Sequence, residues 1–328
     1  MEYLYLIGGL ILLVVSGNYL VESAVGIAKK FRLSSLVIGM TIVAFGTSAP
    51  ELVVSVQAAI SGHPEIALGN VVGSNIANIG LIMGLTAIIF PVFASSRSMK
   101  VDWTFLMIIS ILFVIAAWNG FFSRLDGIIA VSLLILFTIW SIYSQKNEKE
   151  SKKEVEKAQK HILINLLIFT ISCVGLTFGA DFLVKGASTL ALKLGLSERV
   201  VSVVIVGVGT SLPELTASLI AAVKKEDGIT LGNIIGSNIF NVLGVLGLTG
   251  IVKPIVFSAT EFRSDFLWML GFTFLLFIGM LNITENHKKY SESKNLLHLI
   301  HTQKGLIGRI WGFFALALYV FYVVQLFI

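Results

Sequence analysis

Long apolar segments alternate with short polar ones along the whole chain. A helix that crosses the hydrocarbon core of a bilayer needs about 20 apolar residues, whereas strands of a membrane β-barrel are about ten residues long and alternate in polarity. No segment alternates in that way, so the pattern predicts an all-α polytopic membrane protein with ten transmembrane helices. These helices are expected at about 4–27, 34–60, 66–91, 101–118, 125–143, 162–185, 197–223, 229–252, 263–282 and 305–327.

The composition agrees with a membrane protein whose main partner is the lipid bilayer. Of the 328 residues, 56% are hydrophobic and 13% are charged, about half the charged share of a soluble domain. This balance excludes a soluble globular protein and a disordered chain. The net charge of +5 comes from loops rather than from a basic domain, so no nucleic-acid partner is expected. Cys173 is the only cysteine, so no disulfide can form within one chain.

A charged segment divides the chain near its middle. Residues 144–161 contain six lysines and four glutamates, and we expect them to form a cytoplasmic loop. The halves on either side, 1–143 and 162–328, are each expected to hold five helices. Another polar segment, 284–304, precedes the last predicted helix.

Loop charge predicts the orientation in the membrane. The membrane face that carries the loops after the odd-numbered helices holds 18 of the 24 lysines and arginines, counted from the sequence. Cytoplasmic loops carry the excess of basic residues, so both termini are predicted on the extracytoplasmic side of the cell (inner) membrane. The first segment has no basic region before Lys29 and is expected to be a retained helix rather than a cleaved signal peptide.

The two halves repeat one another at a fixed offset of 163 residues. Between 16–93 and 179–256, 33 of 78 aligned positions are identical, many of them polar residues or glycines. With five helices in each half, the second half must enter the membrane inverted. Inverted repeats that meet at the midplane form a transporter architecture with alternating access. The repeated segments are Gly46–Leu52 with Gly209–Leu215, Leu68–Asn70 with Leu231–Asn233, and Gly73–Ile76 with Gly236–Ile239.

The second and seventh helices are predicted to be broken in the membrane. Gly46 and Pro50 interrupt the second helix, and carbonyl groups near Ala44–Thr47 are expected to be free for other partners. Free backbone at this depth is tolerated where it lines a cavity. Glu51 follows Thr47 by one turn and shares its face. The corresponding residues of the second half are Gly207, Gly209, Thr210, Pro213 and Glu214.

The third and eighth helices are each predicted to be polar on one face. Ser74 and Asn78 are four residues apart, as are Ser237 and Asn241, so each pair shares a helix face. The glycines of these helices allow close backbone approach.

The residue types near the midplane favour a hard cation. Glu51 and Glu214 are the only acids expected deep in the core, with no basic residue near them, so each needs a bound cation or a proton. The available ligands are all oxygens, which argues against zinc or copper. Calcium takes six to eight oxygens, and two bidentate glutamates with the Thr47 and Thr210 carbonyls would supply six. Sodium could use the same carboxylates with neighbouring Ser and Thr oxygens.

The paired G-T-S-x-P-E and G-N-x-x-G-S-N-I-x-N segments resemble the two α repeats of the calcium/cation antiporter superfamily, and most of all its prokaryotic sodium/calcium exchangers. The resemblance implies a transporter, not an enzyme, that carries Ca2+ and Na+ and needs no cofactor. It implies that Glu51 and Glu214 bind both ions and that the first and sixth helices slide across the core. Further ligands implied by the resemblance are the Thr47 and Thr210 carbonyls for Ca2+, Ser48, Ser74 and the Ala44 carbonyl for one Na+, Ser211, Ser237 and the Gly207 carbonyl for another, and Asn78 and Asn241 at the centre.

One position separates this chain from some members of the superfamily. Some carry Asp where this chain has Asn241, and in the potassium-dependent branch that acid is associated with potassium transport. Asn241 therefore argues against potassium dependence. It also leaves two carboxylates at the centre, a charge that one Ca2+ balances, so exchange for three Na+ would be electrogenic.

Some assignments stay open at this stage. Asn75 and Asn238 either touch the ion or bridge helices. Asn18 and Asp181 correspond in the repeat, and we favour a structural role for both, with Asp181 paired to Lys185 one turn later.

Three other functions are consistent with a polytopic membrane protein. Calcium/proton antiport on the same fold would replace sodium by protons at the carboxylates. An ion channel would need a continuous pore, which opposed repeats do not predict. An intramembrane enzyme would need a nucleophile–histidine pair or paired aspartates, and neither is evident.

Overall fold

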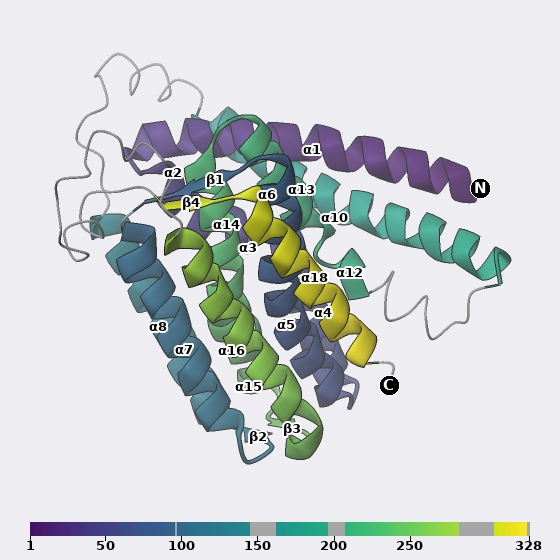
Figure 1. Cartoon of the computed structure of the whole chain (residues 1–328), viewed down its shortest axis with the longest axis vertical. Coiled ribbons are helices and arrows are strands. Elements are labelled where there is room, and N and C mark those ends of the chain that lie inside the picture. Colours follow the sequence, from purple (N-terminus) through teal and green to yellow (C-terminus); the bar gives the residue numbers. More distant parts are fainter. Residues whose placement is uncertain (96, 145–161, 196–206, 282–304, 327–328) are drawn as a thin grey trace.

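A computed structural model of the chain describes residues 1–95, 97–144, 162–195, 207–281 and 305–326, and this part is almost entirely helical (Figure 1). The first half contains α1 (Glu2–Phe31), α2 (Ser35–Ile38), η1 (Gly39–Val43), α3 (Ala44–Thr47), α4 (Ala49–Ile60), α5 (Pro64–Ala77), η2 (Asn78–Met83), α6 (Gly84–Ile89), β1 (Val92–Ala94), η3 (Ser98–Asp102), α7 (Trp103–Ala117), β2 (Phe121–Phe122) and α8 (Arg124–Ser144). The second half contains α10 (Ile162–Lys193), α12 (Gly207–Gly209), α13 (Leu212–Val223), α14 (Asp227–Ile239), η5 (Phe240–Val245), α15 (Leu246–Val252), β3 (Ile255–Val256), α16 (Ala259–Leu281), β4 (Gly305–Ile307) and α18 (Arg309–Gln325).

The described residues confirm a polytopic helical membrane fold. Seven helices are long and apolar enough to cross a membrane, and an eighth is obtained if Ser35–Thr47 and Ala49–Ile60, which meet at 46°, count as one bent span. Two shorter apolar helices, α13 and α18, fall within the remaining predicted segments. The number of ten transmembrane helices therefore stays a prediction.

Most predicted boundaries agree with the structure to within a few residues, and two differ. Helix α10 continues to Lys193 instead of ending near 185. The last predicted helix was expected to begin at 305, but Gly305–Ile307 form strand β4. That prediction was wrong because these residues form backbone hydrogen bonds with β1, a pairing that apolarity alone does not reveal. The charged segment after Ser144, residues 197–206 and residues 284–304 lie outside the described residues.

Helices α1 and α10 form a layer of their own. They lie side by side and cross the rest of the bundle (Figure 1). Their facing residues belong to a hydrophobic cluster that includes Leu20, Ile27 and Leu176 and reaches α13 through Ala217 and Ala221. The cluster is separate from the larger core of the bundle, which is built around side chains such as Phe266 and Phe272 of α16.

Two short antiparallel strand pairs connect the halves of the chain. Strand β1 pairs with β4, and β2 pairs with β3. As a result, α18 of the second half packs on α6 of the first, and α8 of the first packs on α15 of the second. The α8–α15 crossing is close, since a Cβ added to Gly127 would lie 2.6 Å from the Gly247 carbonyl oxygen. Close contact at small residues is typical of helices packed in membranes.

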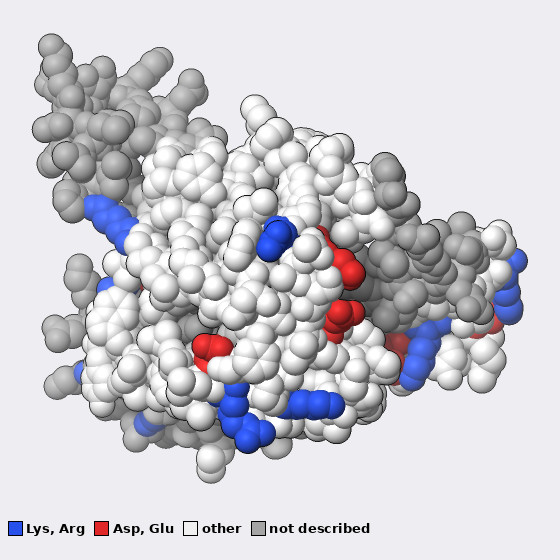
Figure 2. Space-filling view, turned by 90° about the horizontal axis from the view of Figure 1, so that it is seen from below, with Lys and Arg blue, Asp and Glu red and all other residues white. Residues whose placement is uncertain are grey.

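The outer surface of the bundle is that of a lipid-facing protein. Large apolar side chains such as Leu163 (78% exposed) and Ile115 (65% exposed) lie exposed on the outer helices, where a soluble protein would carry polar groups. Seen from the end that carries β2 and β3, charged side chains are few and scattered among uncharged surface (Figure 2). The structure is therefore suited to burial in a bilayer.

Candidate cation-binding site

Two buried glutamates occupy equivalent positions in the two halves. Glu51 lies in the first turn of α4 and Glu214 in the first turn of α13, and the side chain of each is only 1% exposed. Neither oxygen of the Glu51 carboxylate has a hydrogen-bond partner among the described residues, and Glu214 has one free oxygen, Oε2. An unpaired buried carboxylate is costly, so the pair is suited to a cation or to protons.

The helix break just before each of these glutamates is the same in both halves. Ser48 separates α3 from α4 with φ −88° and ψ 8°, and Ser211 precedes α13 with φ −89° and ψ 4°. The break predicted from Gly46 and Pro50 is thus present. One detail of that prediction was wrong: the Ala44 carbonyl is not freed, because it accepts the Ser48 N–H at 3.0 Å. Proline lacks the donor for the carbonyl four residues earlier, which for Pro50 is that of Gly46.

Asparagine braces hold both glutamate turns in place. Asn70 of α5 donates its side-chain amide to the Glu51 carbonyl at 3.2 Å and to Ser55 Oγ at 3.0 Å. The brace recurs in the second half, where Asn233 of α14 donates to the Glu214 carbonyl at 3.4 Å and to Ser218 Oγ at 3.0 Å. Both asparagines belong to the repeated Leu-Gly-Asn segments, but sequence reasoning did not assign them this role.

Four further asparagines link the α5–η2 helix of the first half to the α14–η5 helix of the second. Asn241 Nδ2 donates to Asn75 Oδ1 at 3.1 Å, and Asn78 Nδ2 donates to Asn238 Oδ1 at 3.4 Å. Asn75 Nδ2 also reaches the Asn238 carbonyl at 3.4 Å. Asn75 and Asn238 therefore bridge helices. In Asn78 and Asn241 the amide nitrogen is engaged, and the oxygen has no partner in the described part of the chain.

Buried oxygens without partners gather on the predicted ligand residues. Seven such atoms in the described chain belong to this set, and they include oxygens of carboxylate, amide and hydroxyl groups. They are Glu51 Oε1 and Oε2, Glu214 Oε2, Asn78 Oδ1, Asn241 Oδ1, Ser211 Oγ and Ser237 Oγ. Such a mixture of carboxylate oxygens with neutral amide and hydroxyl oxygens suits a hard cation such as Ca2+.

The other predicted ligands lie around the same helices. Thr47 is fully buried, and its hydroxyl reaches Asn233 Oδ1 at 3.2 Å. Thr210 and Ser74 line one cavity with Asn70. Gly207 begins the short helix α12, just before the break at Ser211. In the described residues no group of three or more His, Cys, Asp or Glu side chains could hold a metal, so a cation here would rely on two carboxylates and neutral oxygens.

One bond across the halves is not matched by its counterpart. Ser48 Oγ donates to Glu214 Oε1 at 2.7 Å. The equivalent hydroxyl, Ser211 Oγ, has no partner among the described residues, and neither has the Glu51 carboxylate. The described site is therefore asymmetric, although its parts are repeated.

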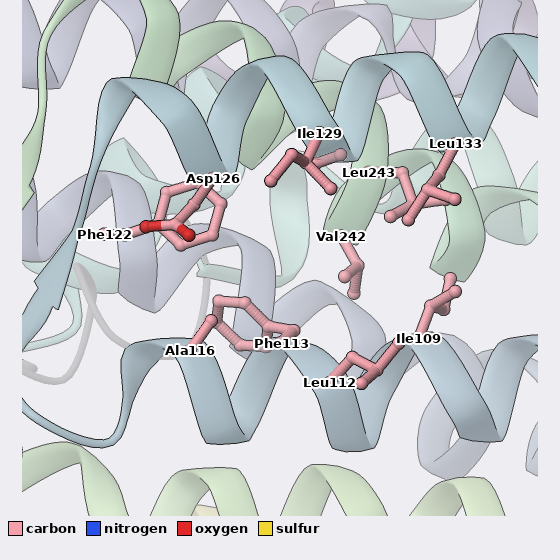
Figure 3. A pocket seen from close by; sticks show the side chains of 11 residues that line it. Ile109, Leu112, Phe113, Ala116, Phe122, Asp126, Ile129, Leu133, Val242 and Leu243 are labelled. Atoms are coloured by element: carbon pink, nitrogen blue, oxygen red, sulfur yellow. The ribbon is translucent and has the colours of Figure 1, made fainter.

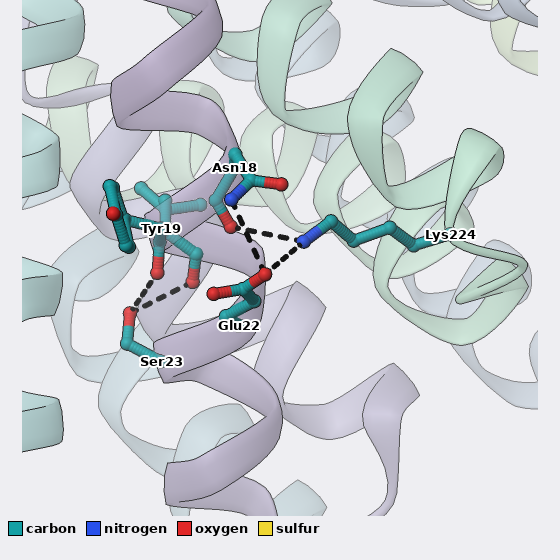
Figure 4. Close-up of polar contacts among 6 residues, drawn as sticks. Asn18, Tyr19, Glu22, Ser23 and Lys224 are labelled. Atoms are coloured by element: carbon teal, nitrogen blue, oxygen red, sulfur yellow. Dashed lines mark hydrogen bonds and ion pairs between the residues drawn. The ribbon is translucent and has the colours of Figure 1, made fainter.

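The polar residues interpreted as structural behave in that way. Asp181 forms an ion pair with Lys185 at 2.6 Å, as predicted. Asn18 donates to Glu22 at 3.3 Å, and Glu22 accepts Lys224 at 2.7 Å (Figure 4). The Glu22–Lys224 pair ties α1 to the turn between α13 and α14.

Sequence reasoning missed one deep carboxylate. Asp102, at the end of η3, is 0% exposed, and neither of its oxygens has a described partner. It lies at the start of the apolar segment predicted at 101–118, and none of the repeated motifs includes it. By contrast, the groove between α7 and α8 that holds Asp126 is otherwise lined by apolar side chains (Figure 3), and Asp126 accepts the Ser123 N–H at 2.8 Å.

Comparisons with known proteins show the family to which the chain belongs. The family described as "Sodium/calcium exchanger protein" matches residues 1–143 and 164–328. The chain is 35% identical to a putative antiporter, CaxA, of Alkalimonas amylolytica over 85% of this chain and 90% of that protein. It is 32% identical to the sodium/calcium exchanger MaX1 of Methanosarcina acetivorans over 85% of this chain and 91% of that protein.

A solved structure resembles the whole fold. The sodium-calcium exchanger NCX_Mj soaked with 10 mM Na+ and zero Ca2+ matches with a TM-score of 0.81 and 32% identity, covering 99% of this chain and 100% of that one. The structure of NCX_Mj soaked with 2.5 mM Na+ and 0.1 mM Ca2+ matches with a TM-score of 0.79 at 30% identity, covering 99% of this chain and 98% of that one. These relatives are transporters rather than enzymes, and the chain belongs to the sodium/calcium exchanger family.

Proposed function

We propose that this protein exchanges Na+ for Ca2+ by alternating access, with Na+ entry driving Ca2+ extrusion. The observation that carries the proposal is the pair of buried carboxylates, Glu51 and Glu214, beside neutral oxygens that have no described partner. Such a site is stable when a cation fills it. The names of its relatives, sodium/calcium exchangers and a putative antiporter, support the same conclusion.

In this proposal the ligands follow the repeated positions. Glu51 and Glu214 bind both ions, and the Thr47 and Thr210 carbonyls complete the Ca2+ site. The unpartnered hydroxyls of Ser211 and Ser237 support a Na+ site on one side. The free oxygens of Asn78 and Asn241 support their place at the centre. The remaining ligands are Ser48 and Ser74 for the second Na+ site and the Gly207 carbonyl for the first, whereas the Ala44 oxygen already accepts the Ser48 N–H and the Thr47 hydroxyl.

The charge of the site favours electrogenic exchange. Two carboxylates balance one Ca2+, so three Na+ would carry one extra positive charge. Moving one charge across the membrane is worth about 2.3 kcal/mol per 100 mV. An inside-negative potential would then favour Na+ entry and Ca2+ exit.

The same proposal includes the membrane arrangement. Ten spans would form two inverted halves, 1–143 and 162–328, on either side of the charged cytoplasmic loop 144–161. Both termini would lie on the extracytoplasmic side of the inner membrane. The matching breaks at Ser48 and Ser211 support the repeat. The hydrophobic cluster that joins α1 to α10 supports their movement as one unit, and it also includes residues of α2, η1, α13 and α14, the elements across which they would move.

The test is Ca2+ uptake into proteoliposomes loaded with Na+ and diluted into Na+-free buffer. Controls are K+-loaded vesicles, a pH jump without Na+, and vesicles clamped at different potentials with K+ and valinomycin. We expect uptake only with internal Na+, and faster uptake when the interior is made positive, because Na+ exit then removes charge.

Other outcomes would redirect the proposal. Uptake driven by the pH gradient and indifferent to Na+ would establish Ca2+/H+ antiport on the same fold. Na+-driven uptake that ignores the potential would keep the exchange and reject its electrogenic form. No uptake under any gradient would overturn the exchange itself.

A further inference from the structure

Asp102 resembles a ligand residue although it lies outside the central site. Its side chain is completely buried, and both carboxylate oxygens lack a hydrogen-bond partner in the described part of the chain. Arg97 Nη2 donates to Ser144 Oγ at 2.7 Å, so the nearby guanidinium acts on Asp102 through its charge and not through a described hydrogen bond. Glu51 is the other described carboxylate with both oxygens buried and unpartnered. A buried charge in this condition is stable only with a cation or a proton.

The repeat gives Asp102 a counterpart. The offset of 163 residues places it in register with Asp265, beyond the aligned segments that define the repeat. Asp265 lies in α16, accepts a hydrogen bond from Tyr322 of α18 at 3.3 Å, and is only partly buried. It lines the same cavity as Ser74 and Thr210, two proposed ligands of the central site.

The two aspartates lie toward opposite ends of the bundle. Asp102 follows β1, which pairs with β4 at one end. Asp265 follows β3, which pairs with β2 at the other end (Figure 1). A cation that travels between the central site and either side of the membrane would pass one of these ends.

We propose that Asp102 and Asp265 are a repeat-related pair of accessory cation sites, one for each side of the membrane, through which the transported ion reaches the central carboxylates. The inference rests on the proposed exchange. Each carboxylate would raise the local concentration of Ca2+ or Na+ on its own side, as charged groups in low-dielectric channels do. Asp265 faces its cavity in the described conformation, and Asp102 is buried.

The experiment measures the Ca2+ KM of Na+-dependent transport separately from each side, in right-side-out and inverted membrane vesicles. We expect Asp265→Asn to raise KM roughly tenfold on one side only, and Asp102→Asn to raise it by a similar factor on the other. Maximal rates should change little, because the central ligands are intact. Glu261→Gln is the matched control, since Glu261 is an exposed carboxylate one turn before Asp265 on the same helix.

Tyr322→Phe separates cation binding from a structural role. If Asp265 only anchors Tyr322, removing the tyrosine hydroxyl should reproduce the full effect of Asp265→Asn. That result would overturn the proposal, as would KM changes that are absent, equal on both sides, or matched by Glu261→Gln.

A second measurement does not depend on transport. The melting temperature of the purified protein is followed as Ca2+ or Na+ is added. We expect Asp102→Asn to raise the cation concentration that gives half of the thermal shift. An unchanged titration would contradict the proposed accessory sites, whether or not the wild type transports Ca2+. Absence of Na+-driven uptake in the wild type would instead count against the proposed exchange.

Discussion

The two halves of the central site share their local structure and differ in their bonds to one another. Asn70 and Asn233 make the same two hydrogen bonds, to a glutamate carbonyl and a serine hydroxyl. Yet the Ser48 hydroxyl donates to the Glu214 carboxylate, whereas the Ser211 hydroxyl and the Glu51 carboxylate have no described partner.

This comparison separates two levels of structure. Contacts within one half follow the repeated sequence and recur. Contacts between the halves depend on how the halves are placed, and these need not be symmetric. A transporter with inverted repeats is asymmetric in any single state, because only one side is open at a time. The unequal bonding of the Glu51 and Glu214 carboxylates is one asymmetry of the described state.

The largest expected effect tests whether the two carboxylates are equivalent in transport despite this difference. Replacing Glu51 or Glu214 by Gln should reduce Na+-driven Ca2+ uptake at least about a hundredfold, since losing one partner of a buried charge interaction costs about 3–5 kcal/mol. The measurement is initial Ca2+ uptake in Na+-loaded proteoliposomes, with Glu261→Gln as the control. Normal uptake in either variant would remove that residue from the site.

The Ser48 and Ser211 pair tests the asymmetry directly. Ser48→Ala should lower the stability of the ion-free protein by about 1.5–3 kcal/mol, the usual value of a hydrogen bond to a charged group. Ser211→Ala loses no described bond and should have a much smaller effect. Thermal unfolding in detergent with a Ca2+ chelator measures both. Equal losses would mean that the two halves are bonded alike in solution.

Packing between α14 and the broken second helix gives the next effect. A Cβ added to Gly236 would lie 2.5 Å from the Met40 backbone, so Gly236→Ala should destabilise the protein by about 1–3 kcal/mol. Gly271→Ala on α16, where a Cβ meets nothing within 4 Å, is the matched control. Comparable melting temperatures for the two variants would argue against this close contact.

The smallest effect concerns the braces that the halves share. Asn70→Ala and Asn233→Ala each remove two hydrogen bonds and should cost about 1–2 kcal/mol each. Because the bonds recur in the two halves, the losses should agree within experimental error. Urea unfolding of the two variants measures the difference, and a large inequality would show that one brace carries more of the structure.

Much of the fold and the site follows from local sequence patterns. The apolar segments, the helix breaks at Ser48 and Ser211 and the burial of Glu51 and Glu214 are all in place. Each depends on residues close together in the chain. The sequence did not reveal strand β4, the full length of α10 or the burial of Asp102, because these depend on segments far apart in sequence.

By itself, then, the sequence determined the membrane class, the internal repeat and the chemistry of the site, since hydropathy, identity at a fixed offset and ligand type are properties of the chain. Only the tertiary structure decided which helices of one half pack on the other half and that Asn75 and Asn238 bridge α5 and α14. It also decided that the Ser48 hydroxyl donates to Glu214 while the Ser211 hydroxyl has no described partner. The physical reason is that hydrogen bonds and close packing act over a few ångströms, so they depend on where two distant segments come to lie.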